Sequence, residues 1–191
     1  MSSPWAVVGL GNPGAKYAQT RHNVGAMAVA DLARALDETL RPKSKVRCAV
    51  AEVRIHQERV VLAVPGSYMN ESGGPTRALS DFFKVAPDRL VVVHDEVDLP
   101  FGSMRLKFAG GDNGHNGLRS IRSSLGTGDW YRLRIGVGRG NSRSGDTAGH
   151  VLARFAGSEQ AALREDLQTA GDAIEALITD GLARAQSQYN S

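Results

Sequence analysis

The 191-residue chain has a single cysteine, Cys48, so it can form no internal disulfide, as is usual for proteins of a reducing cytosol. No apolar run approaches the roughly 18 residues that a membrane-spanning helix requires. The N-terminus also lacks the basic segment and apolar core of a secretory signal. These absences predict a cytoplasmic protein without a membrane partner.

Nucleophiles for covalent catalysis are equally scarce. Cys48 falls in a segment typical of a strand, which favours a structural role over a nucleophilic one. The G-x-S-x-G motif of serine hydrolases is missing, and the serine of PGSYMN lacks that glycine spacing. If the chain is a hydrolase, the attacking group is most simply water.

Acidic residues are scarce in one part of the chain. The formal net charge is +3, but residues 105–143 hold eight basic and two acidic side chains, whereas residues 144–191 hold three basic and seven acidic ones. This asymmetry favours a basic face for a polyanion, and nucleic acid is the natural candidate through its phosphates. A solvated surface is the alternative that charge alone leaves open.

Hydrophobic periodicity predicts one α/β domain over residues 1–191, without internal repeats or a linker. Strands are expected over residues 5–10, 48–55, 59–64, 90–93, 102–108 and 131–137. Helices are expected over residues 24–36, from 72 or 73 onward, over 118–125 and over 158–180, with a helical turn at 150–155. Residues 41–47 are expected to form a basic connector, and residues 138–149 a polar loop.

The first polar loop, residues 9–23, has the sequence GLGNPGAKYAQTRHN. Its glycines fit the G-x-G-x-x-G pattern of dinucleotide-binding proteins. That pattern requires a helix to begin at the glycines and an acidic residue about 20 positions later, after a second strand. Here Pro13 and a polar run separate the glycines from the helix, and Asp31 falls inside the helix. The loop therefore does not favour a nucleotide cofactor.

Polar residues follow or connect several of the expected strands. Asn12, Asn70 and Asn116 lie in three separate loops, while His94 and Asp95 directly follow residues 90–93. Open α/β sheets bind ligands at the carboxyl ends of their strands. If these segments meet there, they form a site suited to a general base oriented by a carboxylate, with amide donors for an oxyanion.

Several segments carry a resemblance to a known family. They are VVGLGNPGAKYAQTRHNVG, SYMNESG, HDEVDLPFG with RLK, GHNGLRS and YRLRIGVGR. In this order, from residue 7 to residue 139, they resemble bacterial peptidyl-tRNA hydrolases, and the C-terminal helix also fits. The resemblance implies a three-layer α/β domain, with a twisted mixed sheet flanked by helices, that is monomeric and contains no metal or cofactor. It also implies cleavage of the ester between a peptide and the 3′-terminal ribose of tRNA, which recycles tRNA in translation and rescues stalled synthesis.

The resemblance assigns roles to individual side chains. His22 would be the general base that takes a proton from water, with its ring oriented by Asp95. Asn12 matches the position that distinguishes a blocked amine from a free aminoacyl group. Asn70 and Asn116 would hold the peptide backbone, because a carboxamide both donates and accepts hydrogen bonds. Asn116 or a nearby backbone N–H would stabilise the oxyanion.

Other side chains would contact the tRNA itself. Tyr17 and Tyr68 would stack on the terminal ribose or base of the CCA end, and Met69 and His115 would wall the pocket. The residues that match the family's grip on the acceptor stem, through phosphates and shape, are Arg105, Lys107 and Arg134. For each of them, ordinary loop packing or a solvated strand edge is the alternative.

A few positions depart from the residues that are frequent in the family: Val64 and Arg105 replace lysine, Asn113 replaces glycine and Gly140 replaces proline. None of them is a candidate catalytic group. Asn113 nevertheless puts the conformation of its loop in question, because glycine there would permit a special φ.

Two other functions compete with this one. Plant-organelle splicing factors that resemble the family bind RNA without catalysis, although the presence of both His22 and Asp95 argues against a lost active site. A metal-dependent hydrolase would use the acidic segment after residue 93. Its ligands would be His94, Asp95, Glu96 and Asp98, which have no recognised metal-ligand spacing.

Overall fold

The computed structural model describes residues 3–140 and 146–191. In these residues one seven-stranded sheet has the order β2-β3-β4-β1-β5-β7-β6. The strands are β1 (Trp5–Gly9), β2 (Arg41–Lys43), β3 (Cys48–Ile55), β4 (Glu58–Pro65), β5 (Leu90–Glu96), β6 (Met104–Phe108) and β7 (Tyr131–Gly136). The four adjacent strands β4, β1, β5 and β7 are parallel. The outer strands β2, β3 and β6 run antiparallel to their neighbours, so the sheet is mixed.

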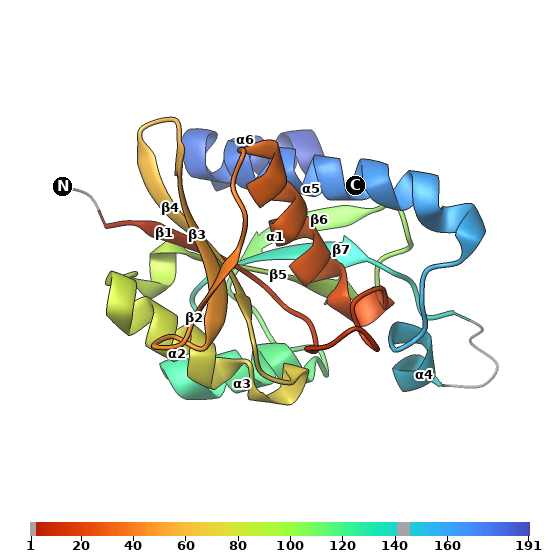
Figure 1. The fold of residues 1–191 in the computed structure, drawn as a ribbon. Helices are drawn as coiled ribbons and strands as arrows, with labels where there is room; N and C mark the ends of the chain where they lie inside the picture. The colour runs from red at the N-terminus through yellow and green to blue at the C-terminus, as the bar shows by residue number, and fades with distance from the viewer. Residues whose placement is uncertain (1–2, 141–145) are drawn as a thin grey trace.

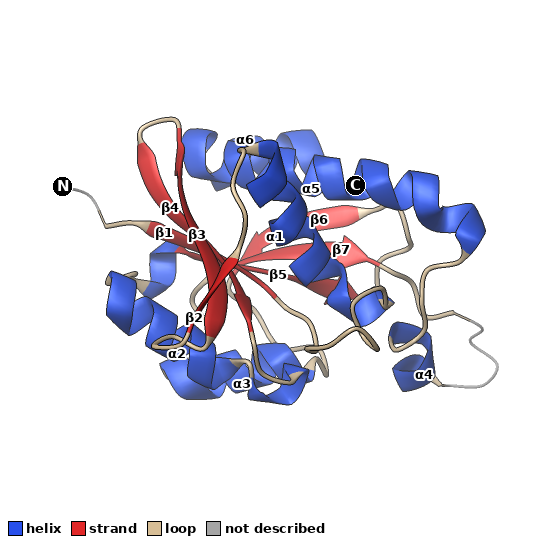
Figure 2. Cartoon of the chain, viewed as in Figure 1, coloured by secondary structure: helices blue, strands red, loops and turns tan. Residues whose placement is uncertain are grey.

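Helices cover both faces of the sheet (Figure 1 and Figure 2). On one face lie α1 (Val24–Ala35), α5 (Gln160–Asp180) and α6 (Leu182–Tyr189), and on the other lie α2 (Gly73–Phe83) and α3 (Asn116–Leu125). A short helix, α4 (Thr147–Val151), lies apart from these layers. The expected three-layer α/β fold is thus confirmed. No helix in the described part of the chain is long and apolar enough to cross a membrane.

The interior strand β5 separates two apolar cores. Val91 and Val93 pack with α1 and α5 in one core, whereas Leu90 and Val92 pack with α2 and α3 in the other, because strand side chains alternate between faces. All seven residues of the strand are buried. A short apolar run thus occupies the covered central position that its composition predicts.

Two glycines allow α1 to cross the sheet at very close range. A Cβ atom on Gly25 would lie 2.0 Å from the backbone oxygen of Val93, and one on Gly9 would lie 2.3 Å from that of Gly25. Both distances are shorter than any real contact, so only glycine fits at these positions. Gly9, the first glycine of the pattern, therefore serves helix–sheet packing together with Gly25, and this packing places the start of α1 over the end of β5.

Several boundaries differ from the sequence-based expectation. Residues 41–43 form the edge strand β2 rather than a connector, and Pro42 is tolerated because an edge strand has a free side. Strand β5 continues beyond residue 93 through the polar segment 94–96, because β7 pairs with those residues and their side chains have buried partners. Segment 94–96 is therefore part of the sheet and not a loop.

Helix boundaries were also partly wrong. Helix α3 begins at Asn116, which places this residue in the first turn instead of a loop. The helical turn expected over residues 150–155 lies earlier, at Thr147–Val151. Helix α5 begins at Gln160, and a 3₁₀ turn precedes it, in which the Glu159 carboxylate accepts a hydrogen bond from the backbone of Ala156. Helix α6 was not expected at all. Part of the predicted loop 138–149, residues 141–145, lies outside the described residues.

Candidate active site

The polar loops meet where the parallel strands end. Asn12 follows β1, the 3₁₀ turn Met69–Glu71 follows β4, and Asp95 is the second-to-last residue of β5. The other contributors come from the 3₁₀ turn Arg21–Asn23, which leads into α1, and from the loop that leads into α3. The sheet thus gathers the predicted residues at one edge, as expected for an open α/β sheet.

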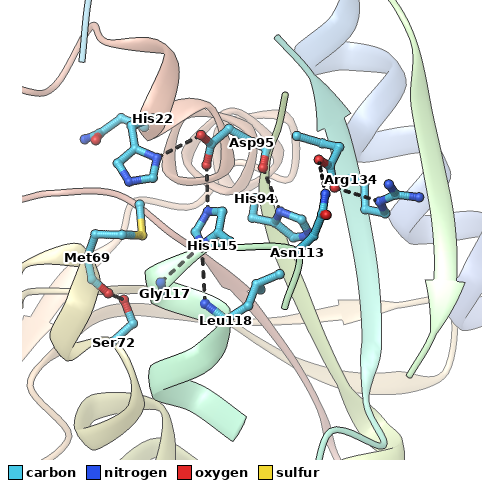
Figure 3. Close-up of polar contacts among 12 residues, drawn as sticks. His22, Met69, Ser72, His94, Asp95, Asn113, His115, Gly117, Leu118 and Arg134 are labelled. Carbon is cyan, nitrogen blue, oxygen red and sulfur yellow. Dashed lines mark hydrogen bonds and ion pairs between the residues drawn. The ribbon is translucent and has the colours of Figure 1, made fainter. Parts of the chain in front are cut away.

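His22 and Asp95 form the centre of this site. The Nδ1 atom of His22 lies 2.8 Å from Oδ2 of Asp95. Only 3% of the Asp95 side chain is exposed, compared with 17% for His22, so the imidazole faces the opening and the carboxylate lies behind it. In the described residues the Nε2 atom of His22 has no hydrogen-bond partner within the protein. Figure 3 shows the ring beside the carboxylate.

His115 is the second imidazole on the same carboxylate. Its Nε2 atom lies 2.8 Å from Oδ1 of Asp95 (Figure 3). Its Nδ1 atom accepts hydrogen bonds from the backbone N–H groups of Gly117 and Leu118, at 3.1 and 3.3 Å, and so caps the N-terminus of α3. Because Nδ1 accepts, it carries no proton, and Nε2 must be the N–H that donates to Asp95. Two backbone contacts therefore fix His115 as a neutral donor.

Asp95 remains a carboxylate despite its burial. Burial acts to raise the pKa of Asp95, but the interaction with His115 and the hydrogen bonds from both histidines outweigh it and hold this pKa well below the usual range. An ionised carboxylate only accepts hydrogen bonds, so the Nδ1 atom of His22 must carry a proton. With the Nδ1 proton held by Asp95, Nε2 is the ring nitrogen that can act as a base.

His94 has a structural position next to this pair. It points to the opposite face of β5 from Asp95, is 1% exposed, and its Nδ1 atom donates to the backbone oxygen of Asp95 at 2.8 Å. Burial, followed by the nearby His115, lowers the pKa of His94 to about 3, so the ring stays neutral. Glu96 shares this face. Glu96 and Asp98 both accept hydrogen bonds from Nδ2 of Asn113. Among the described residues, the four candidate ligands of the metal-hydrolase alternative do not form a metal-binding group with one another.

A different set of ligand atoms does converge. One atom from each of His22, Asp95 and His115 lies within 4.8 Å of the others, a spacing that a metal ion could bridge. Each atom already takes part in a hydrogen bond, and the backbone contacts of His115 require its Nε2 atom to keep a proton. A hydrogen-bonded triad accounts for this geometry, and the absence of a metal stays a prediction.

Asn12 is held in place by two neighbours. Its backbone N–H donates to Oδ1 of Asn23, and Nδ2 of Asn23 donates back to its carbonyl oxygen, both at 2.9 Å. The side-chain Oδ1 of Asn12 accepts a hydrogen bond from the backbone of Met69 at 2.7 Å. Its Nδ2 group has no partner among the described residues. A single amide N–H₂ group is therefore left to meet a substrate.

The other two asparagines line one polar groove. A cavity of about 420 Å³ runs between the Met69–Glu71 turn and α3 and is bordered by Asn70 and Asn116. Arg119 and three serines of α3 complete its lining. Tyr17 and Tyr68 lie edge to face, with ring centroids 6.5 Å apart, and Tyr68 is more than half exposed. The amide and aromatic side chains expected to contact the substrate thus share one neighbourhood.

The three predicted RNA-binding cations lie on strands β6 and β7. Arg105 and Arg134 are directly opposite each other in the antiparallel pair, so both project from the same face, as does Lys107. The Nε atom of Arg134 donates to Oε1 of Glu96 at 3.0 Å. Lys107 and Arg134 also line a cavity of about 320 Å³ with His94 and Asn113.

Asn113 links the loop before His115 to strand β5. It has a left-handed φ of 50°, a conformation that asparagine tolerates better than most residues and that glycine adopts freely. Figure 3 shows Asn113 beside Arg134. The Nδ2 atom of Asn113 donates to Oε2 of Glu96 at 3.0 Å and also to Asp98, which in turn pairs with Arg139. Asparagine thus replaces glycine without strain and adds a tether.

The backbone conformation at Gly140 explains why glycine replaces the family's frequent proline here. Its φ is 73°, whereas the proline ring fixes φ near −65°. A Cβ atom at this position would also lie 2.5 Å from Nδ1 of His150. The backbone here therefore adopts a conformation that proline could not.

Sequence reasoning did not predict the supporting contacts of three residues at the site. These are Asn23, which secures Asn12, Glu96, which orients Arg134, and Asn113, which tethers the loop of His115. It also treated His115 as a wall of the pocket and not as a partner of Asp95. The proximity of Asn23 to His22 was a usable signal, but nothing in the sequence indicates the partners of Glu96.

Comparisons with known proteins agree with this geometry. A family model described as peptidyl-tRNA hydrolase matches residues 6–191. The chain belongs to the peptidyl-tRNA hydrolase family. The peptidyl-tRNA hydrolase of Frankia alni is 52% identical, covering 98% of this chain and 94% of that protein, and that of Streptomyces coelicolor is 48% identical, covering 99% and 96%.

Solved structures show the same relationship. The crystal structure of peptidyl-tRNA hydrolase from Acinetobacter baumannii matches with a TM-score of 0.91 at 37% identity, and the alignment covers 100% of this chain and 96% of that one. The family and the fold class expected from the sequence are thus both confirmed.

Proposed function

We propose that the protein hydrolyses the ester between peptide and tRNA in peptidyl-tRNA and releases both for reuse in translation. The observation that carries this proposal is the His22–Asp95 pair at 2.8 Å, in which the carboxylate is buried and the imidazole is partly exposed, at the sheet edge where Asn12 contacts the Met69–Glu71 turn. Such a pair supplies a general base for water, and in the described residues the His22 ring has no hydrogen bond to a serine or cysteine that it could activate instead.

In the proposed reaction, His22 acts twice. Its Nε2 atom takes a proton from water while the water oxygen bonds to the ester carbonyl carbon, and Asp95 stabilises the ring as it becomes charged. The resulting oxyanion accepts hydrogen bonds from the Nδ2 group of Asn116 or from a nearby backbone N–H. When the carbon–oxygen bond to the ribose breaks, the imidazolium returns its proton to the 3′ oxygen.

The surrounding side chains would hold the substrate. We assign the free Nδ2 group of Asn12 to the carbonyl oxygen of the blocked amine, which a free aminoacyl group lacks. Asn70 and Asn116 would bind peptide backbone without regard to its side chains. Tyr17 and Tyr68 would contact the terminal nucleotide, beside the pocket walls Met69 and His115. The phosphates of the acceptor stem would meet Arg105, Lys107 and Arg134.

The proposal includes the setting of the reaction. The chain would act as one catalytic domain over residues 1–191, as a monomer, in the cytoplasm where translation supplies the substrate. It would need neither a metal nor a cofactor.

The test compares two substrates that differ only at the amine. N-acetylated aminoacyl-tRNA should be hydrolysed and the unblocked form should not, with and without a chelator. Binding of tRNA without ester hydrolysis would refute the proposal in favour of a non-catalytic RNA-binding protein. Loss of activity in the chelator, restored by metal, would refute the metal-free mechanism alone.

A further inference from the structure

The outer edge of the sheet at β6 is covered by the end of the chain. Strand β6 is an edge strand, so its outward backbone groups have no neighbouring strand to pair with. Helix α6 packs beside β6. Residues 186–191, here called the strap, comprise the last turn of α6 and the two residues after it, and they hydrogen-bond to this edge. The strap takes the place of a missing strand.

Asn190 imitates a peptide group in this contact. Its Oδ1 atom accepts a hydrogen bond from the backbone N–H of Leu106 at 2.7 Å, and its Nδ2 atom donates to the carbonyl oxygen of the same residue at 3.3 Å. Gln186 adds a second donor to that oxygen at 3.1 Å. Ser191 pairs with Met104 through both its backbone N–H and its hydroxyl oxygen, at 3.2 and 3.3 Å.

The strap also contacts a residue of the basic face. The Nε atom of Arg105 donates to the backbone oxygen of Ser191 at 3.2 Å, and in the described residues its terminal Nη groups have no partner. Arg134, directly opposite on β7, shows the same arrangement, because its Nε atom donates to Glu96. In both arginines a hydrogen bond therefore restrains the Nε atom, while the terminal Nη groups remain available to a ligand.

We propose that the strap is a positioning element that holds Arg105 ready to contact an RNA phosphate. The inference rests on the proposed function, since it needs tRNA as the ligand. An exposed arginine loses side-chain freedom when it binds, and each such side chain costs a factor of about 2 to 12 in affinity. Holding the Nε atom in advance reduces that loss without adding a phosphate contact.

The experiment measures tRNA binding by the full chain with Asn190→Ala. Gln188→Ala is the matched control, because Gln188 lies in the last turn of α6, two residues before Asn190, its side chain is exposed, and it has no hydrogen bond to β6 among the described residues. Asn190→Ala should weaken binding about 3- to 10-fold and leave the slope of log Kd against log salt unchanged. Arg105→Ala should weaken binding and also reduce that slope by about one.

A double-mutant cycle separates positioning from simple structural support. In the Arg105→Ala background, Asn190→Ala should have no further effect on tRNA affinity, because the side chain that the strap holds is gone. The kcat measured on an N-acetylaminoacyl ester of a short CCA oligonucleotide, which has no acceptor stem, should stay at the wild-type value. Hydrogen exchange at the Leu106 amide should become faster in Asn190→Ala and report that the strap has detached.

Several results would overturn the inference. One is equal tRNA affinity for Asn190→Ala and Gln188→Ala although faster exchange at the Leu106 amide shows that the strap has detached in Asn190→Ala. The others are additive losses of affinity in the double-mutant cycle and an Arg105→Ala variant that binds tRNA as tightly as the wild type. Gln186→Ala, which removes one bond to Leu106, gives a milder second variant if Asn190→Ala is poorly folded. The proposed function itself fails on a different result, the absence of ester hydrolysis by the wild type.

Discussion

The Nδ1 atom of His22 lies 2.8 Å from Oδ2 of Asp95, although the two residues are 73 positions apart in the chain. His22 lies in the turn that enters α1, and Asp95 lies near the end of the buried strand β5. The glycine-mediated crossing of α1 over β5 brings these elements together. Since Asp95 can only accept a hydrogen bond, the pair leaves the second ring nitrogen of His22 available as a base.

Replacing Asp95 with asparagine should remove the contact that keeps the His22 proton on Nδ1. The carboxamide can donate to Nδ1 of His22 and so favour the tautomer that carries its proton on Nε2. In that tautomer Nε2 has no lone pair to accept a proton from water. We expect Asp95→Asn to lower kcat by roughly 10²- to 10⁴-fold with little change in KM. Steady-state kinetics on N-acetylaminoacyl-tRNA measures this effect. Asp88→Asn, at an exposed site, is the control, and equal kcat values for the two variants would disprove the role of Asp95.

The two contacts of His115 can be separated by substitution. His115→Asn retains a good N-cap for α3 but loses the bond to Asp95, whereas His115→Ala loses both. Both variants lose the bond to the buried Asp95 carboxylate and should be less stable than the wild type, and the alanine variant should lose about 0.5–2 kcal/mol more in urea unfolding because it also lacks the cap. Both should lose roughly tenfold in kcat, the equivalent of one hydrogen bond. Wild-type kcat in His115→Asn would show that the Asp95 contact does not matter.

Asn12 tests how the blocked amine is recognised. Asn12→Asp preserves the oxygen that accepts from Met69 but removes the free N–H₂ group. We expect kcat/KM on N-acetylaminoacyl-tRNA to fall about 10- to 100-fold, because a substrate oxygen then faces a carboxylate. The thermal midpoint serves as the check on folding. A variant with normal kcat/KM would place amine recognition elsewhere.

His94 should make stability depend on pH. Its pKa is lowered to about 3 in the folded protein, compared with about 6.5 in an unfolded chain. Below pH 6.5 the unfolded state therefore binds a proton that the folded state does not. The protonation of His94 therefore leaves the free energy of unfolding unchanged above pH 6.5 and lowers it by about 1.4 kcal/mol for each pH unit as the pH drops from 6.5 toward 3.

Urea unfolding between pH 7 and pH 4 measures this dependence. His94→Phe should show a shallower loss of stability than the wild type, whereas His56→Asn, at an exposed turn position, should lose stability as steeply as the wild type. Parallel curves for the wild type and His94→Phe would contradict the buried, neutral state of His94.

Local sequence patterns predicted much of the fold. The apolar run at residues 90–93 and the periodic segments 24–36 and 160–180 have strong signals, because burial on one or both faces fixes their composition. The end of β5 was missed because His94, Asp95 and Glu96 are polar, and only their partners from distant segments make them suitable for a buried strand. Helix α6 was missed because its apolar contacts lie on a narrow face.

The site shows the same division. The motif resemblance identified His22, Asp95 and the three asparagines, which the structure brings to one edge of the sheet. The supporting contacts of Glu96 and Asn113 could not be predicted, since they depend on exact distances between segments far apart in sequence. The residues proposed to touch substrate belong to motifs, whereas the residues that position them are specified by packing.

The most direct test of the account is single-turnover hydrolysis of N-acetylaminoacyl-tRNA by His22→Ala and the wild type. We predict a loss of at least roughly 100-fold in the chemical step, the effect of removing a general base, with tRNA affinity unchanged. A His22→Ala variant that hydrolyses the substrate nearly as fast as the wild type would show that another group activates the water, and would contradict the central claim.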